Sequence, residues 1–159
     1  MTTPASAAVP TTASALGLAA HPEGGWFRRN YTSPLAVSTD GGERPAVTLI
    51  HYLLAPGEES AWHVVSSDEM WLWHGPGALE LRLGGTGDKP GSPGEVQAVT
   101  LGPDTAAGHV AQLLVPAGVW QSAVLVGDAE ALMSCMVSPG FDFADWRLAT
   151  DVGRGPRGA

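Results

Sequence analysis

The segment 57–75 holds the residues best suited to chemistry. It reads GEESAWHVVSSDEMWLWHG and contains His63 and Glu69. Strand side chains alternate between the faces of a sheet, so His63, Glu69, Trp71 and Trp73 share a face if the corner between two strands has an even length. Burial and mutual hydrogen bonding suit such a pair to proton transfer near neutral pH. We therefore predict His63 and Glu69 as catalytic residues, with His63 as the base. The alternative is a core histidine that only hydrogen-bonds Glu69.

The same two side chains could begin a metal site. A catalytic divalent metal generally has about three or more protein ligands. His63 and Glu69 supply two, Gln121 is a weak oxygen donor, and His51 joins them only if its side chain points inward. We therefore favour no metal and no other cofactor. A divalent metal on His63, Glu69, Gln121 and His51 is kept as the alternative.

The remaining histidines are predicted to lie outside the site. His74 has the opposite parity from Glu69 and precedes Gly75, which indicates an outer-face or turn position. His21 and His109 fall in loop-like segments and are expected to be solvated.

Aromatic and basic residues flank the predicted pocket. Trp71, Trp73 and Trp120 lie on its strands, and large rigid rings suit an apolar or ring-shaped ligand; the alternative is simple core filling. Arg28 and Arg29 face opposite sides of their strand, so one of them is placed to reach an anionic ligand.

Short strands must position these residues. Turn signals recur at about 8 to 12 residues, which favours a β-sandwich or barrel over alternating strands and helices. The predicted strands are 26–31, 46–55, 60–65, 69–74, 78–83, 96–101, 112–115, 120–126 and 129–137. A short helix is expected to end between Leu16 and Ala20, and the stretches 33–44 and 84–95 are predicted as loops. The segment 141–148 resembles a helix or an extra strand.

Length and composition indicate one domain and exclude several functions. The 159 residues fit a single domain over 16–150, with a disordered arm at 1–15 and a frayed tail at 151–159. The net charge of -8 would repel a phosphate backbone, so nucleic acid is not expected as a partner. No apolar run is long enough to cross a membrane. The lone Cys135 and the absence of a secretory segment favour the cytoplasm.

Five blocks in order resemble a known family. They are HPEGGWFRRNYTSP, PGEESAWHVVSSDEMW, the Leu101-Gly102 turn, VPAGVWQSAVL and VSPGFDFADWRL. Together they are similar to the small RmlC-like cupin family of unknown function, the Cupin_5 type, over about residues 16–148. Gly57, His63 and Glu69 match the first cupin motif, while Val65 and Gln121 stand where further metal ligands usually lie.

The resemblance implies an all-β fold, the cupin double-stranded β-helix or jelly-roll barrel, with a short N-terminal helix and a homodimer. It places His63, Glu69 and Gln121 in the pocket, and Arg28 and Tyr31 at positions that members usually keep. Relatives by fold include metal-free sugar epimerases and metal-dependent dioxygenases and isomerases. The chain departs from the family at His51, Val64 and Leu72, and the exchange of polar groups for Val64 and Leu72 indicates a more apolar ligand.

These observations predict a small-molecule enzyme. The expected chemistry is metal-independent proton transfer, as in an epimerase, isomerase, cyclase or lyase, in an apolar pocket lined by tryptophans. The expected ligand-binding residues are Arg28, Tyr31, His51, Trp71, Trp73, Trp120 and Gln121. The alternatives are a metal-dependent lyase or dioxygenase, and a non-catalytic module that binds a small organic ligand.

Overall fold

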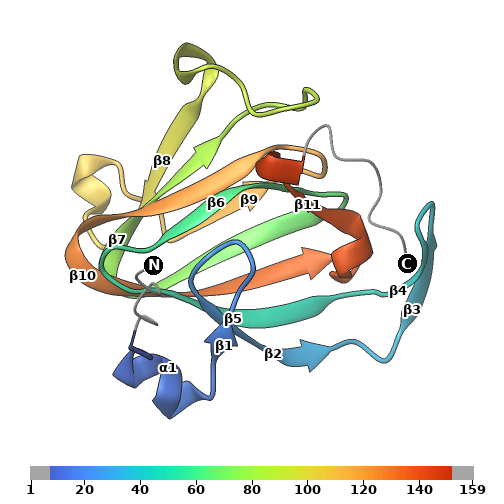
Figure 1. Ribbon diagram of the computed structural model, residues 1–159, viewed down its shortest axis with the longest axis horizontal. Helices are drawn as coiled ribbons and strands as arrows, with labels where there is room; N and C mark the ends of the chain where they lie inside the picture. Colours follow the sequence, from blue (N-terminus) through green and yellow to red (C-terminus); the bar gives the residue numbers. More distant parts are fainter. Residues whose placement is uncertain (1–7, 152–159) are drawn as a thin grey trace, which may run out of the picture.

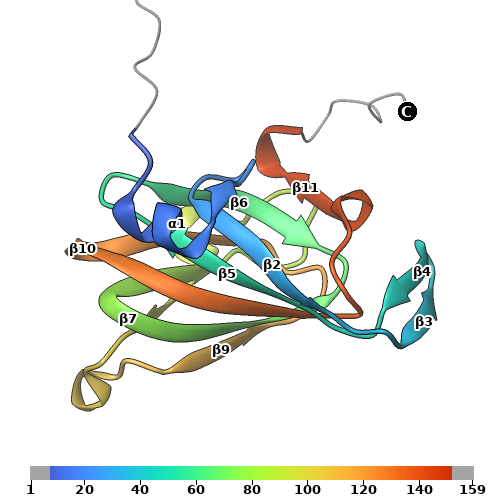
Figure 2. The same ribbon diagram turned by 90° about the horizontal axis from the view of Figure 1, so that it is seen from below.

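Two long strands, β7 (Asp68–Leu83) and β10 (Gln121–Ser138), organise the fold because each runs through both walls of a barrel (Figure 1). The computed structural model describes residues 8–151. The first wall has the order β1 (Ala19–Ala20), β2 (Trp26–Thr32), β5 (Thr48–Leu54), the second half of β10, the first half of β7, and β9 (Gln112–Val115). The second wall has the order β11 (Trp146–Leu148), β6 (Glu59–Val65), the first half of β10, the second half of β7, and β8 (Gln97–Leu101). All these pairings are antiparallel, and the two walls curl over each other (Figure 2). The predicted all-β jelly-roll barrel is confirmed.

Both long strands bend where the sequence predicted turns. Pro76 pairs with Ala131 and Gly75 with Leu132, so β7 stays in the sheet through Gly75-Pro76-Gly77. A Cβ on Gly77 would lie 2.2 Å from the Ala129 oxygen, so this crossing of two backbones requires glycine. The prediction of separate strands at 69–74 and 78–83, and at 120–126 and 129–137, is therefore wrong.

The chain ends of the domain also differ from expectation. Helix α1 (Thr11–Leu16) ends at Gly17, which has φ 64°, and lies mostly within the stretch predicted to be an unstructured arm. The rest of that arm at 1–7, and the tail at 152–159, lie outside the described residues. The predicted loop at 33–44 instead contains a two-stranded hairpin, β3 (Ala36–Thr39) with β4 (Gly42–Pro45).

Short 3-10 turns complete the structure. They are η1 (Pro93–Glu95), η2 (Thr105–Ala107), η3 (Phe143–Asp145) and η4 (Ala149–Asp151). The segment 141–148 thus forms a turn followed by a short strand, which combines the two predicted alternatives.

The core lies between the two walls. Its buried residues are Tyr52, Leu54, Trp71, Leu79, Leu81, Leu101, Val115, Ala123, Ala131, Met133 and Cys135. A smaller cluster of Ala13, Leu18 and Leu53 fixes α1 to the outside of β5. None of the helices in the described part of the chain is long and apolar enough to cross a membrane.

Candidate active site

A tight turn at residues 21–25 carries two side chains into the open end of the barrel. The amide of His21 donates to the carbonyl of Gly25 at 2.9 Å, and the amide of Gly24 donates to the carbonyl of His21 at 3.0 Å. Gly25 has φ 72°, and a Cβ there would lie 2.7 Å from the Leu53 oxygen. Glycine thus lets the turn pack directly on β5. The result is that His21 and Glu23 face the pocket.

Glu23 is buried among polar groups. Its Oε1 accepts a hydrogen bond from the Ser60 hydroxyl at 3.0 Å, and its Oε2 accepts one from the Trp146 indole at 3.2 Å. The Nε2 atom of His63 lies 3.3 Å from the same Oε2, and the Nδ1 atom of His21 lies 3.6 Å from it. Glu23 is therefore the carboxyl group paired with His63.

The tautomer of His63 follows from its second contact. Nδ1 lies 2.7 Å from the carbonyl oxygen of Ala61, which can only accept a hydrogen bond, so Nδ1 carries a proton. In the neutral ring, Nε2 then holds the lone pair and faces Glu23. A proton between Glu23 and His63 can reside on either partner.

Glu69 is held from the opposite side by a chain of side-chain hydrogen bonds. The indole of Trp71 donates to Oε1 of Gln121 at 2.8 Å, and Nε2 of Gln121 donates to Oε2 of Glu69 at 2.7 Å. All three side chains are buried. Gln121 thus fixes the direction of the Glu69 carboxyl group without facing the pocket itself.

Burial shifts the pKa of each of these four groups in the direction that favours its uncharged form. Burial raises the pKa of Glu23 from 4.5 to about 7, and the hydrogen bonds from Trp146 and Ser60 oppose this shift. Burial also raises the pKa of Glu69 to about 7, opposed by nearby His63. Burial lowers the pKa of His63, and together with His63 it lowers that of His21 to about 4. The pocket therefore contains two carboxyl groups that titrate near neutral pH and two neutral imidazoles.

Apolar side chains form the walls around these groups. Phe27, Ile50, Val65, Val137, Phe141, Phe143 and Trp146 line the pocket, together with Arg29, Thr48, Tyr52 and Cys135. The ring centroids of Phe141 and Phe143 are 5.0 Å apart, and those of Phe143 and Trp146 are 5.5 Å apart. The aromatic wall therefore comes from β2, the loop before β11 and the first residue of β11, rather than from β7.

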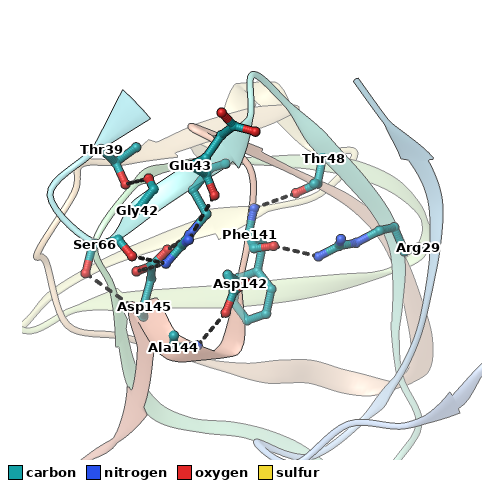
Figure 3. A network of polar contacts seen from close by, with 12 residues as sticks. Arg29, Thr39, Gly42, Glu43, Thr48, Ser66, Phe141, Asp142, Ala144 and Asp145 are labelled. Atoms are coloured by element: carbon teal, nitrogen blue, oxygen red, sulfur yellow. Dashed lines mark hydrogen bonds and ion pairs between the residues drawn. The ribbon is translucent and has the colours of Figure 1, made fainter. Parts of the chain in front are cut away.

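Polar contacts fasten this loop over the pocket (Figure 3). The amide of Phe141 donates to the Thr48 hydroxyl at 2.9 Å, and Arg29 Nη2 donates to the Phe141 carbonyl at 2.7 Å. Nε and Nη2 of Arg44 donate to the two carboxylate oxygens of Asp145 at 2.7 and 3.1 Å. Both ends of the loop are thus tied to neighbouring strands.

Some of the predicted site residues come together and others do not. His63 and Glu69 line one pocket, with Trp71 and Gln121 directly behind Glu69. Trp73 packs against the core, and its indole donates to the Gly77 carbonyl at 2.8 Å.

Trp120 also lies away from the pocket. It is buried beside the 84–91 loop, where its indole donates to the Gly87 carbonyl at 2.8 Å. The guanidinium of Arg147 lies 5.3 Å from the centre of its ring.

Three predicted ligand-binding residues lie on the outer face of the first wall. Arg28 pairs with His51 across β2 and β5, and both alternate with the inward-facing Arg29 and Ile50. The His51 ring contacts Asn30, and Tyr31 is 49% exposed. Arg28, Tyr31 and His51 therefore do not reach the pocket of this chain.

The other histidines also occupy definite positions. His74 lies on the outer face, where its Nε2 contacts the Ser134 hydroxyl at 2.6 Å. His109 is half-buried in the loop after η2, where its Nδ1 accepts from the Asp104 amide. The prediction that His21 is solvated is wrong, because the turn buries it against Phe27 at 4.5 Å between ring centroids.

The residues named as the alternative metal ligands do not form a ligand set. His51 faces the other side of the sheet, and both ends of the Gln121 amide are engaged by Trp71 and Glu69. Within residues 8–151, no group of three His, Cys, Asp or Glu side chains is arranged to hold a metal ion.

His21 and Glu23 are candidate functional residues that were not predicted from the sequence. The signal was present, because a histidine and a glutamate lie next to Gly24-Gly25 in a turn. Two consecutive glycines with positive φ indicate a close approach to other backbone, and residues in such a turn face whatever the turn packs against.

Comparisons with known proteins agree with this fold. The chain is 30% identical over 142 residues to the uncharacterized protein YML079W of Saccharomyces cerevisiae, and this match covers 79% of the chain and 67% of the yeast protein. A hypothetical protein from Leishmania major has a solved structure with TM-score 0.76 and 29% identity, covering 85% of this chain and 83% of its own. Protein SO0799 from Shewanella oneidensis has TM-score 0.75 and 35% identity, covering 86% and 81%. The model of the Cupin_5 family, described as "Cupin superfamily (DUF985)", matches residues 11–149, and the chain therefore belongs to this family.

Proposed function

We propose that the chain is a small-molecule enzyme of the cupin type that transfers protons within its barrel pocket. The reaction class is epimerisation, isomerisation, cyclisation or elimination. The observation that carries this proposal is the 3.3 Å contact between His63 Nε2 and Glu23 Oε2, with both side chains buried in an apolar pocket.

The roles follow from the protonation states. His63 is the base, since its Nδ1 proton is held by Ala61 and its lone pair lies on Nε2. A proton taken up by the ring is stabilised by the carboxylate of Glu23. Glu69, whose pKa is raised to about 7, returns or accepts the second proton. Two carboxyl groups around one imidazole allow a proton to be removed at one position and delivered at another.

Deuterium uptake tests the reactions that return a solvent proton to carbon, as epimerisation and isomerisation do, whatever the substrate is; an elimination is detected in the same spectra by the lost mass of its leaving group. Small molecules extracted from the natively purified protein, and a cell extract, are incubated with the protein in D2O and analysed by mass spectrometry. We expect one or more compounds to gain deuterium at carbon with the unaltered protein and with His74→Gln, which changes a histidine on the outer face. His63→Ala and Glu23→Gln should abolish the uptake.

Two results would count against the proposal. Undiminished uptake by His63→Ala would remove the imidazole from the reaction. A ligand that co-purifies and comes back unlabelled and unchanged would support the non-catalytic binding module instead.

We also propose that the chain forms a homodimer through the outer face of the first wall. Two adjacent rows of cross-strand partners cover this face. They are Tyr31, Leu49, Met136, Met70 and Leu114, and Arg28, His51, Ser134, Leu72 and Gln112. Neither row contains an acidic residue, so two copies of an acidic chain can meet there without bringing carboxylates together. A cytoplasmic location is part of the same proposal, and the single, buried, unpaired Cys135 fits a reducing compartment.

A further inference from the structure

Arg29 is a cation at the pocket that no carboxylate neutralises. It lines the pocket from β2, next to Ile50 on the neighbouring strand. Its Nη2 donates to the Phe141 carbonyl at 2.7 Å (Figure 3). Arg29 takes part in none of the ion pairs found among residues 8–151.

Most of the donors of Arg29 therefore remain for a ligand. A guanidinium group carries five N–H donors in one plane, and the Phe141 carbonyl accepts a bond from one of its terminal nitrogens. The planar group matches the two oxygens of a carboxylate or a phosphate. Arg29 is also solvent-exposed, so its charge can reach a ligand at the mouth without the cost of burying an unpaired ion.

The other basic groups near the pocket are already engaged or point away. Arg44 is paired with Asp145, and Arg28 extends over the outer face to the Leu16 carbonyl. His21 and His63 are neutral at pH 7, because burial lowers the pKa values of both. Arg29 is thus the one full positive charge that lines the pocket within the described part of the chain.

The aromatic side chains of the pocket indicate the shape and polarity of the uncharged part of the ligand. The rings of Phe27, Phe143 and Trp146 surround His21, with centroid distances of 4.5, 6.0 and 6.2 Å. Aromatic walls of this kind favour a flat, apolar body that stacks or packs edge to face. Deeper in the pocket lie His63 and the two buried carboxyl groups.

We infer that the pocket takes a small organic anion with an apolar, ring-shaped body. Its carboxylate or phosphate pairs with Arg29 at the mouth, and its body lies against Phe143 and Trp146. The orientation of the reacting atom toward His63 rests on the proposed function, whereas the recognition of an anion does not.

Matched aromatic probes test the inference. Binding of benzoate, phenyl phosphate, benzamide and benzyl alcohol is measured by NMR titration of the amide signals of Phe27 and Ile50. We expect the unaltered protein to bind benzoate or phenyl phosphate about ten- to a hundredfold more tightly than benzamide or benzyl alcohol. The stronger of the two anions identifies which anionic group the pocket accepts.

Three variants distinguish the effect of the Arg29 charge from the effect of its hydrogen bond to the Phe141 loop. Arg29→Gln should abolish the preference for the anion, while Arg28→Gln, on the adjacent residue of the opposite face, should retain it. Thr48→Val removes the other anchor of Phe141 without changing charge, so it should weaken anionic and neutral probes alike and leave their ratio unchanged. Added NaCl should weaken the anion alone, and this measurement needs no variant.

Several outcomes would overturn the inference. The first is equal affinity of the unaltered protein for benzoate, phenyl phosphate and benzamide. The second is a preference for the anion that survives in Arg29→Gln. The third is a loss of this preference in Arg28→Gln as large as the loss in Arg29→Gln. Failure of the proposed function is distinguishable, because His63→Ala should lose deuterium uptake yet keep the preference for the anion.

Discussion

The Nδ1 atom of His63 lies 2.7 Å from the carbonyl oxygen of Ala61, two residues earlier on β6. This contact within one strand decides which nitrogen of the ring faces Glu23. Because the strand backbone supplies the acceptor, the imidazole is oriented before any ligand binds.

The first prediction concerns this tautomer. Long-range proton–nitrogen NMR at pH 7 should show His63 neutral, with the proton on Nδ1 and a lone pair on Nε2. Burial lowers the pKa of His63, so the neutral form should persist below the ordinary pH range of histidine titration. A spectrum with the proton on Nε2 would contradict the arrangement. The half-buried His109, which accepts from a backbone amide through Nδ1, is the internal comparison with the opposite tautomer.

The second prediction concerns stability against pH. The pKa of Glu23 is about 7 in the folded chain and 4.5 ordinarily, so between these values the folded state binds more protons than the unfolded state. The free energy of unfolding therefore falls as pH rises through this window, by about 3 kcal/mol for this group. Urea unfolding should show Glu23→Gln gaining about that much relative to the unaltered chain between pH 4.5 and 7.

The matched control for this measurement is Glu59→Gln, on the exposed side of β6. It should follow the unaltered chain at every pH. The depressed pKa of His21 has the opposite sign, since stability rises with pH between about 4 and 6.5, and this contribution is present in all three proteins. Glu69 has the same sign as Glu23, and because the charge of Glu23 helps to raise the pKa of Glu69, its loss in Glu23→Gln changes stability in the same direction. A parallel pH profile for Glu23→Gln and the unaltered chain would show that Glu23 is not buried as described.

The third prediction concerns the hydrogen bonds behind Glu69. Gln121→Met keeps the volume but leaves the Trp71 indole without an acceptor and removes the amide donor from Glu69, which within residues 8–151 then keeps only its contact with the Cys135 thiol. We expect a loss of about 2–4 kcal/mol in the free energy of unfolding, because each buried polar group left unpaired is costly. The neighbouring Ser122 is the control, since its buried hydroxyl has no hydrogen-bond partner among the described residues. Ser122→Ala should be neutral or stabilising, and an equal loss in both variants would refute the role given to Gln121.

The barrel, and the half of the site that holds His63 and Glu69, could be predicted from the sequence because strand side chains alternate between the two faces of a sheet. The period of two through His63, Val65, Glu69 and Trp71 places all four side chains inside, and the corner at Ser66 and Ser67 keeps their parity. Family resemblance gave the fold, and the family match confirms it.

For the other half of the site, the Gly24-Gly25 signal indicates a close contact with other backbone but does not indicate which backbone that is. Which way Glu23 points is decided by where the turn docks, here against β5 and β6 through Gly24 and Gly25. Similarly, the sequence Gly75-Pro76-Gly77 is typical of a turn that ends a strand. Here it only bends β7, and the strand continues because the facing segment of β10 still pairs with it. The β3–β4 hairpin was not predicted because it has no alternating apolar face. It is held instead by the ion pair between Arg44 and Asp145.

The fourth prediction concerns the outer face of the first wall. Tyr31 and Leu114 stand at the two ends of a five-residue apolar row across β2, β5, β10, β7 and β9, and they are 49% and 43% exposed. An exposed apolar row across a sheet is typical of an interface between subunits. Met136 lies at the middle of the row, so a two-fold axis there would bring its two copies close together.

Met136→Lys should therefore convert the dimer to a monomer, because two like charges would meet in an apolar interface. Light scattering on a sizing column at several concentrations measures the mass. Val126→Lys is the control, since Val126 is 47% exposed on the same strand but lies in the second wall, and it should remain dimeric. A monomeric unaltered chain, or an unchanged dimer in Met136→Lys, would show that this face does not join two copies.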